Sequence, residues 1–340
     1  MIDVTMTRGH VYHLCGSPTS DFFYDLSMIY AKDVCVPDGW SCTFLVVDPK
    51  GMWRLGDKVN ELSEPQKFKE VLEVIRLGSL IVPHLFCKEG MTLYRTLFEQ
   101  ILGYSLVGSK GSTMELAADK LRARESVLAG GVSIAPGGLA LRDTEPPIPF
   151  PLVVKPNKED NSKGVTLVYN QSEYRRAYEE AKSFGEFVLV EKYVAGRELR
   201  VGLVRLGEEY HFPPVIEYSL DPEYPIRSTK DKLDIDEVGR PTGQSSASQS
   251  ATICPAQINE ETLIRVKEQA IKAHEALGAR HYSLFDFKIE EATGEPIFLE
   301  AGLYWSFSPV SMISKMLIAG GESLEKMIDK VWREALVGSS

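Results

Sequence analysis

The sequence predicts a mixed α/β fold of two or three domains, and three observations support this prediction. The chain has 340 residues, and a domain usually holds about 150. Hydrophobic residues make up 44% and charged residues 25% of the chain, which is ordinary globular usage with enough apolar material for a core. In the first hundred residues, strand-length apolar runs alternate with segments of helical periodicity, as in a parallel open sheet.

We expect an N-terminal open-sheet domain over residues 1–110. Three apolar runs are predicted as strands: 10–15, 43–47 and 80–85. Three segments with apolar residues at helical spacing are predicted as helices: 21–31, 64–77 and 92–101.

A central lid domain is expected over residues 111–190. Ser112 and Glu115 have the spacing of a capping box and predict one helix from there to about Ala129. A proline-rich linker then leads into a smaller α+β unit. Its predicted elements are strands 152–155, 165–168 and 187–191 and helix 172–184. The first predicted strand after this unit is 198–204.

A C-terminal domain is expected over residues 191–340. Its segment 219–255 is polar and rich in Gly, Ser and Pro, so we expect a functional or disordered loop there. Asn259 is the predicted N-cap of a long helix that ends at Gly278. His274 lies on the apolar stripe of that helix and is predicted to be a packed histidine.

Charge and cysteine content exclude several classes of protein. The net charge is −10, which disfavours general nucleic-acid binding. No apolar run reaches the ~18 residues of a membrane span, and the start lacks a hydrophobic signal region, so we expect a soluble, cytoplasmic protein. A homodimer is one of the assembly states that the sequence leaves open. Five scattered cysteines are predicted to be free thiols: Cys15, Cys35, Cys42, Cys87 and Cys254.

A predicted hairpin brings two carboxylates together. Apolar and polar residues alternate around Asp286, and a turn with Gly294 leads into a second strand. Asp286 and Glu300 each lie seven residues from Thr293, so a hairpin centred there places them opposite each other. Facing carboxylates repel unless a cation lies between them, and hard oxygen ligands suit Mg²⁺, or Mn²⁺, bound together with phosphates. The alternative is an exposed pair on a solvated sheet face.

Lysines and a polar loop accompany this pair. Lys120 lies in the predicted helix of the lid, and Lys155 ends a strand. The loop 156–164 contains Ser162 and is suited to lie over phosphates. A strand-to-strand hinge follows Glu191, and such a hinge can bind an adenine through backbone groups.

The order VVKP, NSKG, VLVEK, GRE, FDF and FLEA resembles the ATP-grasp superfamily, in particular its D-alanine–D-alanine ligase branch. The resemblance covers nearly the whole chain and implies three domains around a nucleotide cleft. It implies that Lys120 and Lys155 contact the phosphates of ATP and that Ser162 belongs to the lid loop. The residues implied to frame adenine and ribose are Glu191, Lys192 and Val194 for the base and Glu198 for the sugar. Asp286 and Glu300 would hold Mg²⁺.

Two positions depart from that branch. D-Alanine ligases have an arginine two residues before the metal-binding aspartate, where this chain has Leu284, and an asparagine two residues after the metal-binding glutamate, where it has Gly302. Losing an oxyanion donor typically costs about 3 kcal/mol in the transition state. The electrophile is therefore expected to differ from a plain carboxylate.

Longer phrases narrow the resemblance. They are HLCGS, FYDLS, PHLFCKEGMT, RHYSLFDF and FLEAGLYWSFSPVS, and they look like the ligases of mycosporine-like amino acid biosynthesis. Those enzymes join a small amino acid, such as serine or threonine, to mycosporine-glycine. The resemblance implies that ATP phosphorylates the ring ketone, an amine displaces the phosphate, and an imine, ADP and phosphate result.

Further site residues complete this hypothesis. The resemblance implies that Ser311 contacts the carboxylate of the incoming amino acid. The alternative is that its hydroxyl is a helix N-cap. Ser306 and Ser308 are weaker candidates for the same contact. Arg227, Lys230 and Lys232 lie in the polar loop and could reach the γ-phosphate. Two other functions stay open: a dipeptide or amide ligase acting through an acyl phosphate, and an inactive nucleotide-binding scaffold.

Overall fold

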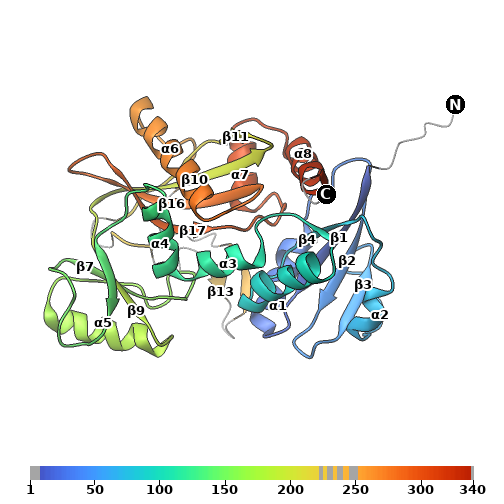
Figure 1. Cartoon of the computed structure of the whole chain (residues 1–340), viewed down its shortest axis with the longest axis horizontal. Helices are drawn as coiled ribbons and strands as arrows, with labels where there is room; N and C mark the ends of the chain where they lie inside the picture. The colour runs from blue at the N-terminus through green and yellow to red at the C-terminus, as the bar shows by residue number, and fades with distance from the viewer. Residues whose placement is uncertain (1–7, 222–224, 228–232, 236–239, 245–251, 338–340) are drawn as a thin grey trace.

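The computed structural model describes residues 8–221, 225–227, 233–235, 240–244 and 252–337. Three sheets follow one another along the described chain (Figure 1). No helix among these residues is long and apolar enough to cross a membrane.

The first sheet has the strand order β3-β2-β1-β4-β5. Its strands are β1 (Gly9–Gly16), β2 (Trp40–Val47), β3 (Trp53–Gly56), β4 (Leu80–Pro83) and β5 (Ser105–Leu106). Strand β1 runs parallel to β2 and β4, and only β3 is antiparallel to its neighbour. The predicted strands and the first helix, α1 (Asp21–Lys32), are confirmed.

Two helix predictions in this part were wrong in extent or type. Only α2 (Phe68–Leu72) forms within 64–77, because Gln66 exchanges both backbone hydrogen bonds with Trp53 and is thereby held in an extended bridge. The predicted helix 92–101 is replaced by two π-helical segments, η1 (Gly90–Tyr94) and η2 (Leu97–Ile101).

The predicted helix of the lid is two helices, α3 (Gly111–Ala118) and α4 (Lys120–Ala129). Asp119 interrupts them with an extended backbone (φ −93°, ψ 101°) and caps α4. Its Oδ1 also accepts a hydrogen bond from Nδ2 of Asn157 at 2.8 Å, which holds the break in place. The capping box was also wrong, because the N-cap of α3 is Lys110, which makes no side-chain capping bond.

A four-stranded sheet, in the order β6-β9-β7-β8, follows α4. Its elements are β6 (Gly137–Ala140), β7 (Leu152–Pro156), β8 (Thr166–Val168), α5 (Gln171–Ser183) and β9 (Val188–Lys192). Buried residues of α5 pack with β7 and β9 in one core. Strand β6 was not predicted; the other four elements were.

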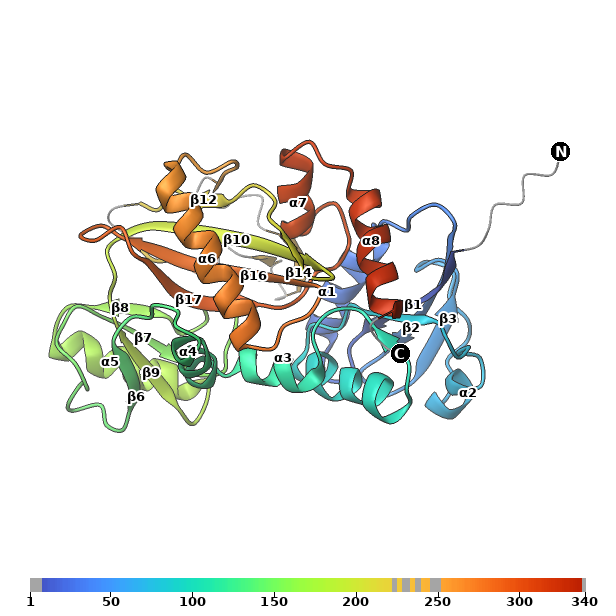
Figure 2. The same cartoon turned by 45° about the horizontal axis from the view of Figure 1, so that its top comes forward.

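The third sheet has the order β15-β12-β10-β16-β17, with β11 also paired to β10. The strands are β10 (Gly196–Leu206), β11 (Glu209–His211), β12 (Ile216–Tyr218), β15 (Thr252–Ile253), β16 (Tyr282–Glu290) and β17 (Pro296–Gly302). The helices of this part are α6 (Glu260–Ala276), α7 (Met312–Ala319) and α8 (Leu324–Val337). Figure 2 shows α6 crossing obliquely over β10 and β16.

Segment 219–255 is not structureless where it is described. It contains β15 and a separate ladder of β13 (Leu233–Ile235) with β14 (Pro241–Gln244). Lys230 and Lys232, the candidate phosphate-binding lysines of this segment, lie outside the described residues.

The two faces of the third sheet differ in chemistry. One face carries Leu199, Val201, Phe285 and Phe287, which pack with buried residues of α6. On the other face, the end of the sheet near Leu284 belongs to a core shared with α7, α8 and the first sheet. The remainder of that second face is polar and forms the site described below.

Two smaller predictions were confirmed. His274 is 0% exposed and lies 2.9 Å (Nδ1) from Oγ of Ser283. All five cysteines are free.

Candidate active site

The predicted carboxylate pair is confirmed in the strand register. Strands β16 and β17 form the expected antiparallel hairpin, and Asp286 is the direct partner of Glu300. Asp286 is 2% exposed and Glu300 is half-buried. The pair therefore lies at the edge of the polar face, with its inner member removed from solvent.

Arg200 on β10 is the register partner of Asp286 on the other side. It donates from Nε to Oδ1 of Asp286 at 2.6 Å and from Nη2 to Oδ2 at 2.5 Å. Three neighbouring strands thus present Arg200, Asp286 and Glu300 in one row. A fork of this kind is among the stronger hydrogen-bonded ion pairs.

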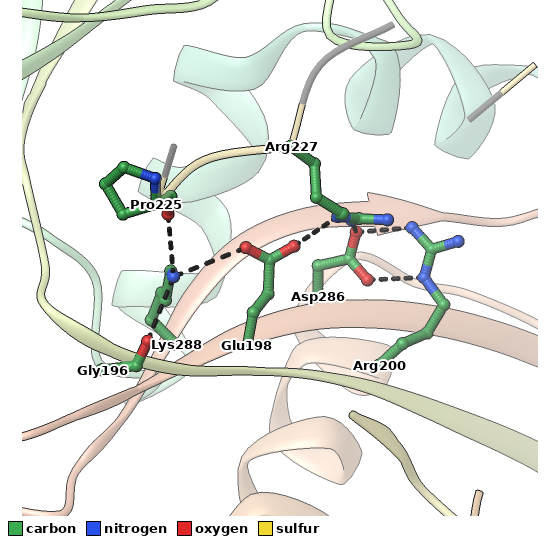
Figure 3. Close-up of polar contacts among 7 residues, drawn as sticks. All are labelled: Gly196, Glu198, Arg200, Pro225, Arg227, Asp286 and Lys288. Carbon is green, nitrogen blue, oxygen red and sulfur yellow. Dashed lines mark hydrogen bonds and ion pairs between the residues drawn. The ribbon is translucent and has the colours of Figure 1, made fainter. Parts of the chain in front are cut away.

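A second row, one step along the same face, holds Glu198 on β10 opposite Lys288 on β16. Arg227 joins the two rows, because it donates from Nε to Glu198 at 2.6 Å and from Nη2 to Asp286 at 2.7 Å (Figure 3). Its guanidinium also lies over the ring of Tyr218, 3.9 Å from the centroid. Lys288 is 3.7 Å from Glu198 and donates to the carbonyl oxygens of Gly196 and Pro225.

This group, which we call the carboxylate–arginine cluster, consists of Glu198, Arg200, Arg227, Asp286 and Lys288. With every side chain ionised it carries three positive and two negative charges; the half-buried Glu300 beside Asp286 adds a third negative charge, so the excess belongs to the buried part alone. Burial lowers the pKa of Lys288 despite the attraction of Glu198. For Arg200, burial is opposed by the Asp286 carboxylate, and the pKa stays well above its ordinary value. A buried excess of positive charge is stabilised by a bound anion.

A second buried ion pair lies on the four-stranded sheet. Nζ of Lys155 is 2.5 Å from Oε2 of Glu191, and Nε of Arg124 is 3.5 Å from Oε1. All three side chains are at least nine-tenths buried. Here too, two cations share one carboxylate, so both buried groups favour anions.

The other lid candidates lie close by in the fold. Lys120 begins α4 instead of lying in a helix interior, and its Nζ contacts the carbonyl oxygen of Glu159. Ser162 is half-buried in the loop after β7 and has a positive φ of 58°. The loop starts at Asn157, which is buried and fixed to Asp119.

The candidate hinge residues point in different directions. Nζ of Lys192 donates to the carbonyl oxygen of Phe150 at 3.0 Å, back toward the linker. Val194 packs with Ala135 and Ile297 in a small apolar cluster. This cluster offers an apolar surface of the kind that a flat base requires.

The three serine candidates are all buried. Ser311 is the N-cap residue of α7 but makes no capping bond; its Oγ donates to the carbonyl oxygen of Ser308 at 2.8 Å and lies 2.9 Å from Oγ of Ser314. Oγ of Ser308 accepts from the backbone N–H of Val310. Oγ of Ser306 has no hydrogen-bond partner among the described residues.

An aromatic group lies next to the row of Glu300. Tyr304, just after β17, packs edge-on against Phe86 at 5.8 Å, and Phe86 packs against Tyr30 of α1 at 5.1 Å. Tyr30 lies on α1 and Phe86 after β4, whereas Tyr304 follows β17, so this aromatic group joins the first and last parts of the chain.

Asp286 and Glu300 fit a divalent cation only in a restricted way. Their oxygens are the hard donors that Mg²⁺ prefers, but three of the roughly four acceptor positions of the Asp286 carboxylate are taken by Arg200 and Arg227. No group of three His, Cys, Asp or Glu suited to a metal occurs in the described part of the chain. A cation held here would therefore need oxygens from the substrate as well.

The two departures noted in the sequence form the next row of the same face. Leu284 pairs with Gly302 on β17 and with Gly202 on β10. This row is apolar and carries no charge, so the cations on this face of the three strands are Arg200, beside Asp286, and Lys288, two residues along β16.

Sequence reasoning missed Arg200, Lys288 and Arg124. For the first two a partial signal was present, because charged residues alternate with apolar ones in 198–201 and 285–289 and so share one face of each strand, although this does not show that the two strands pair. Arg124 gave no such signal, since only the fold brings α4 to Glu191.

Comparisons with known proteins agree with this architecture. The family model described as "D-ala D-ala ligase C-terminus" matches residues 140–333. A D-alanine--D-alanine ligase from Chlorobium luteolum is 31% identical over 232 residues, which are 66% of this chain and 60% of that protein. Another from Citrifermentans bemidjiense is 28% identical over 265 residues, covering 76% and 77%. A third, from Halalkalibacterium halodurans, is 29% identical over 179 residues, and the chain spans only 54% of its length.

Solved structures share the fold. The VanG D-Ala:D-Ser ligase from Enterococcus faecalis superposes with a TM-score of 0.76 at 21% identity, covering 96% of this chain and 99% of that one. The D-alanine-D-alanine ligase from Coxiella burnetii gives 0.74 at 15% identity, covering 98% and 95%. The predicted α/β, ATP-grasp fold class is thereby confirmed.

Proposed function

The chain belongs to the D-ala D-ala ligase C-terminus family, and from this premise we propose that it is an ATP-dependent ligase that forms a carbon–nitrogen bond. The observation that carries the proposal is the facing pair Asp286 and Glu300 beside a buried cluster with excess positive charge. Such a site suits a polyphosphate with its divalent cation.

The proposed nucleotide contacts follow the sequence analysis. Lys120 and Lys155 bind the phosphates, Ser162 covers them from the lid, and Glu198 binds the ribose. Glu191, Lys192 and Val194 frame the adenine. Arg227 leaves its contacts with Glu198 and Asp286 and binds oxygens of the nucleotide instead. Lys232 also binds the γ-phosphate. Mg²⁺, or Mn²⁺, held by Asp286, Glu300 and the phosphates, would neutralise charge during phosphoryl transfer.

The proposed domain division is 1–110, 111–190 and 191–340. Each range contains one of the three main sheets, apart from the last two residues of β9, Glu191 and Lys192. The buried pair of Lys155 and Glu191 lies on the four-stranded sheet and the carboxylate–arginine cluster on the sheet of the last range. A nucleotide bound between the two sheets would contact both groups.

We propose mycosporine-glycine and a small amino acid, serine or threonine, as the substrates. ATP transfers its γ-phosphoryl group to the ring ketone oxygen, the amine attacks the ring carbon, and the C–O bond breaks as phosphate leaves. The products are an imine, ADP and phosphate. Leu284 supports this route, because no tetrahedral acyl oxyanion requires a donor there.

Two parts of the site would receive these substrates. The group of Tyr30, Phe86 and Tyr304 offers aromatic faces for a conjugated ring. Ser311, with Ser306 and Ser308, binds the carboxylate of the amino acid. The hydroxyl of Ser306 has no partner among the described residues, so it would give up no hydrogen bond on binding this carboxylate.

A dipeptide or amide ligase acting through an acyl phosphate is the second candidate. The printed names of the relatives favour it, since these are D-alanine--D-alanine ligases. An inactive nucleotide-binding scaffold is the third candidate function. Gly302 favours it, because glycine stands where D-alanine ligases have an asparagine.

Release of ADP from the purified protein with ATP and Mg²⁺ separates the three. Mycosporine-glycine with serine should give one ADP per product and a new, red-shifted ultraviolet band. ADP release with two free amino acids, and none with mycosporine-glycine, would favour the dipeptide ligase. A scaffold releases ADP with neither pair.

A further inference from the structure

Arg200 is fixed on the sheet beside the proposed phosphate site. It lies in the middle of β10, the central strand of its sheet, and its side chain is 17% exposed. Its fork to Asp286 sets the orientation of the guanidinium. Tyr218 lies beside it, with the guanidinium carbon 5.5 Å from the ring centroid.

The fork leaves part of Arg200 available. A guanidinium has five N–H donors, and Asp286 uses one on Nε and one on Nη2. Nη1 donates to no group within the described part of the chain. In Figure 3 this nitrogen lies on the side of the guanidinium away from Asp286.

The position of Arg200 indicates which anion these donors would meet. Neighbouring strands lie about 4.8 Å apart, so Arg200 is one strand from Asp286 and two from Glu300. The adjacent row of Gly202, Leu284 and Gly302 is uncharged. An oxygen anion bound at the two carboxylates through a cation thus has Arg200, the direct register neighbour of Asp286, beside it, whereas Nζ of Lys288 on the same face already donates to the carbonyl oxygens of Gly196 and Pro225.

We propose that Arg200 is a catalytic residue that binds the phosphoryl group transferred from ATP. The inference rests on the proposed function. During transfer the bond from the γ-phosphorus to the β,γ-bridging oxygen breaks and a bond to the acceptor oxygen forms. Negative charge is spread over the three equatorial oxygens, and Nη1 of Arg200 donates to one of them. Asp286 holds the guanidinium in place for this contact.

The test compares nucleotides with and without a γ-phosphate. Arg200→Gln and Arg200→Lys are made, with Arg197→Gln as the matched control, because Arg197 is on the same strand and makes an exposed fork to Glu217. Binding of the β,γ-imido analogue of ATP and of ADP is measured by calorimetry at fixed Mg²⁺. Circular dichroism checks that each variant is folded.

We expect Arg200→Gln to bind the imido analogue about tenfold more weakly and ADP within twofold of wild type, with kcat for ADP release reduced about 10²-fold. Arg200→Lys should retain part of the analogue affinity, and Arg197→Gln all of it. Equal losses for both nucleotides, or a raised KM for the amino acid with unchanged analogue binding, would overturn the inference. If the wild-type protein binds neither nucleotide, the proposed function itself fails.

Discussion

Asp286 and Glu300 are register partners across a β-bulge. Phe287 pairs with Phe298, and the preceding residue of β16, Asp286, pairs with Glu300. Leu299 is therefore an extra residue on β17. If the ladder continued without this shift, Leu299 would face Asp286. A bulge that re-aims a side chain is typical of functional sites, and here it places the second carboxylate.

Loss of charge at this pair should remove activity. In Asp286→Asn, two guanidiniums lose a buried partner, so we expect no ADP release and a free energy of unfolding lower by about 3–5 kcal/mol. Glu300→Gln, at a half-buried position, should lose activity with little loss of stability. Activity assays and thermal unfolding measure both effects, with the exposed Glu291→Gln as control. Normal turnover of Asp286→Asn at low Mg²⁺ would exclude the metal assignment.

Local sequence patterns predicted most strands and this pair. Alternation and a turn at Gly294 predicted the hairpin, because its two strands are adjacent in the chain, but the pairing of Asp286 with Glu300 also requires the bulge at Leu299, which the sequence analysis did not predict. Arg200 was missed because it is 86 residues from Asp286, and the register between such distant strands depends on packing that no local pattern encodes. The break at Asp119 depends in the same way on Asn157, 38 residues away.

A third oxygen ligand can be introduced at Gly302. A Cβ there would lie 3.7 Å from Cβ of Leu284 and 3.7 Å from a ring carbon of Tyr304, which is ordinary contact. We expect Gly302→Asn to fold and to lower the Mg²⁺ concentration for half-maximal nucleotide binding about tenfold, or ~1.4 kcal/mol. Titration of Mg²⁺ against a fixed nucleotide measures this.

The comparison variant for Gly302→Asn is Gly202→Asn, in the same row. Its Cβ would approach Sδ of Met316 to 3.1 Å and Cγ of Pro213 to 3.2 Å. It should therefore lose stability without any gain in Mg²⁺ affinity. An unchanged Mg²⁺ requirement in a folded Gly302→Asn protein would show that Gly302 does not face the cation.

Nucleotide binding should slow hydrogen exchange in the loop 158–164. Asn161 and Ser162 both have positive φ angles, of 55° and 58°, so this loop holds a backbone conformation that non-glycine residues rarely adopt. Backbone contacts with phosphates would stabilise that conformation. Exchange measured by mass spectrometry, with and without an ATP analogue, tests the expectation. Equal exchange rates in the two samples would mean that the loop does not close on nucleotide.

Acid should destabilise the protein through its buried histidines. The contribution of His274 to this loss of stability can be measured. Burial, followed by the nearby Arg205 charge, lowers the pKa of His274 to about 4. Above pH 6.5 the side chain is neutral in both states; below it, only the unfolded chain binds the proton until the pH reaches about 4. The free energy of unfolding therefore decreases as the pH is lowered through this window. For this residue the decrease from pH 8 to pH 5 is about 2 kcal/mol.

His84 and His281, whose pKa values burial lowers to about 3, act in the same direction. We expect His274→Gln, which keeps an acceptor for Ser283, to reduce the loss of stability between pH 8 and pH 5 by about 2 kcal/mol relative to wild type. Urea unfolding at the two pH values measures this difference. His211→Gln is the control, since His211 is half-exposed beside Glu322. An equal pH dependence in His274→Gln and wild type would mean that His274 takes up its proton in the folded state.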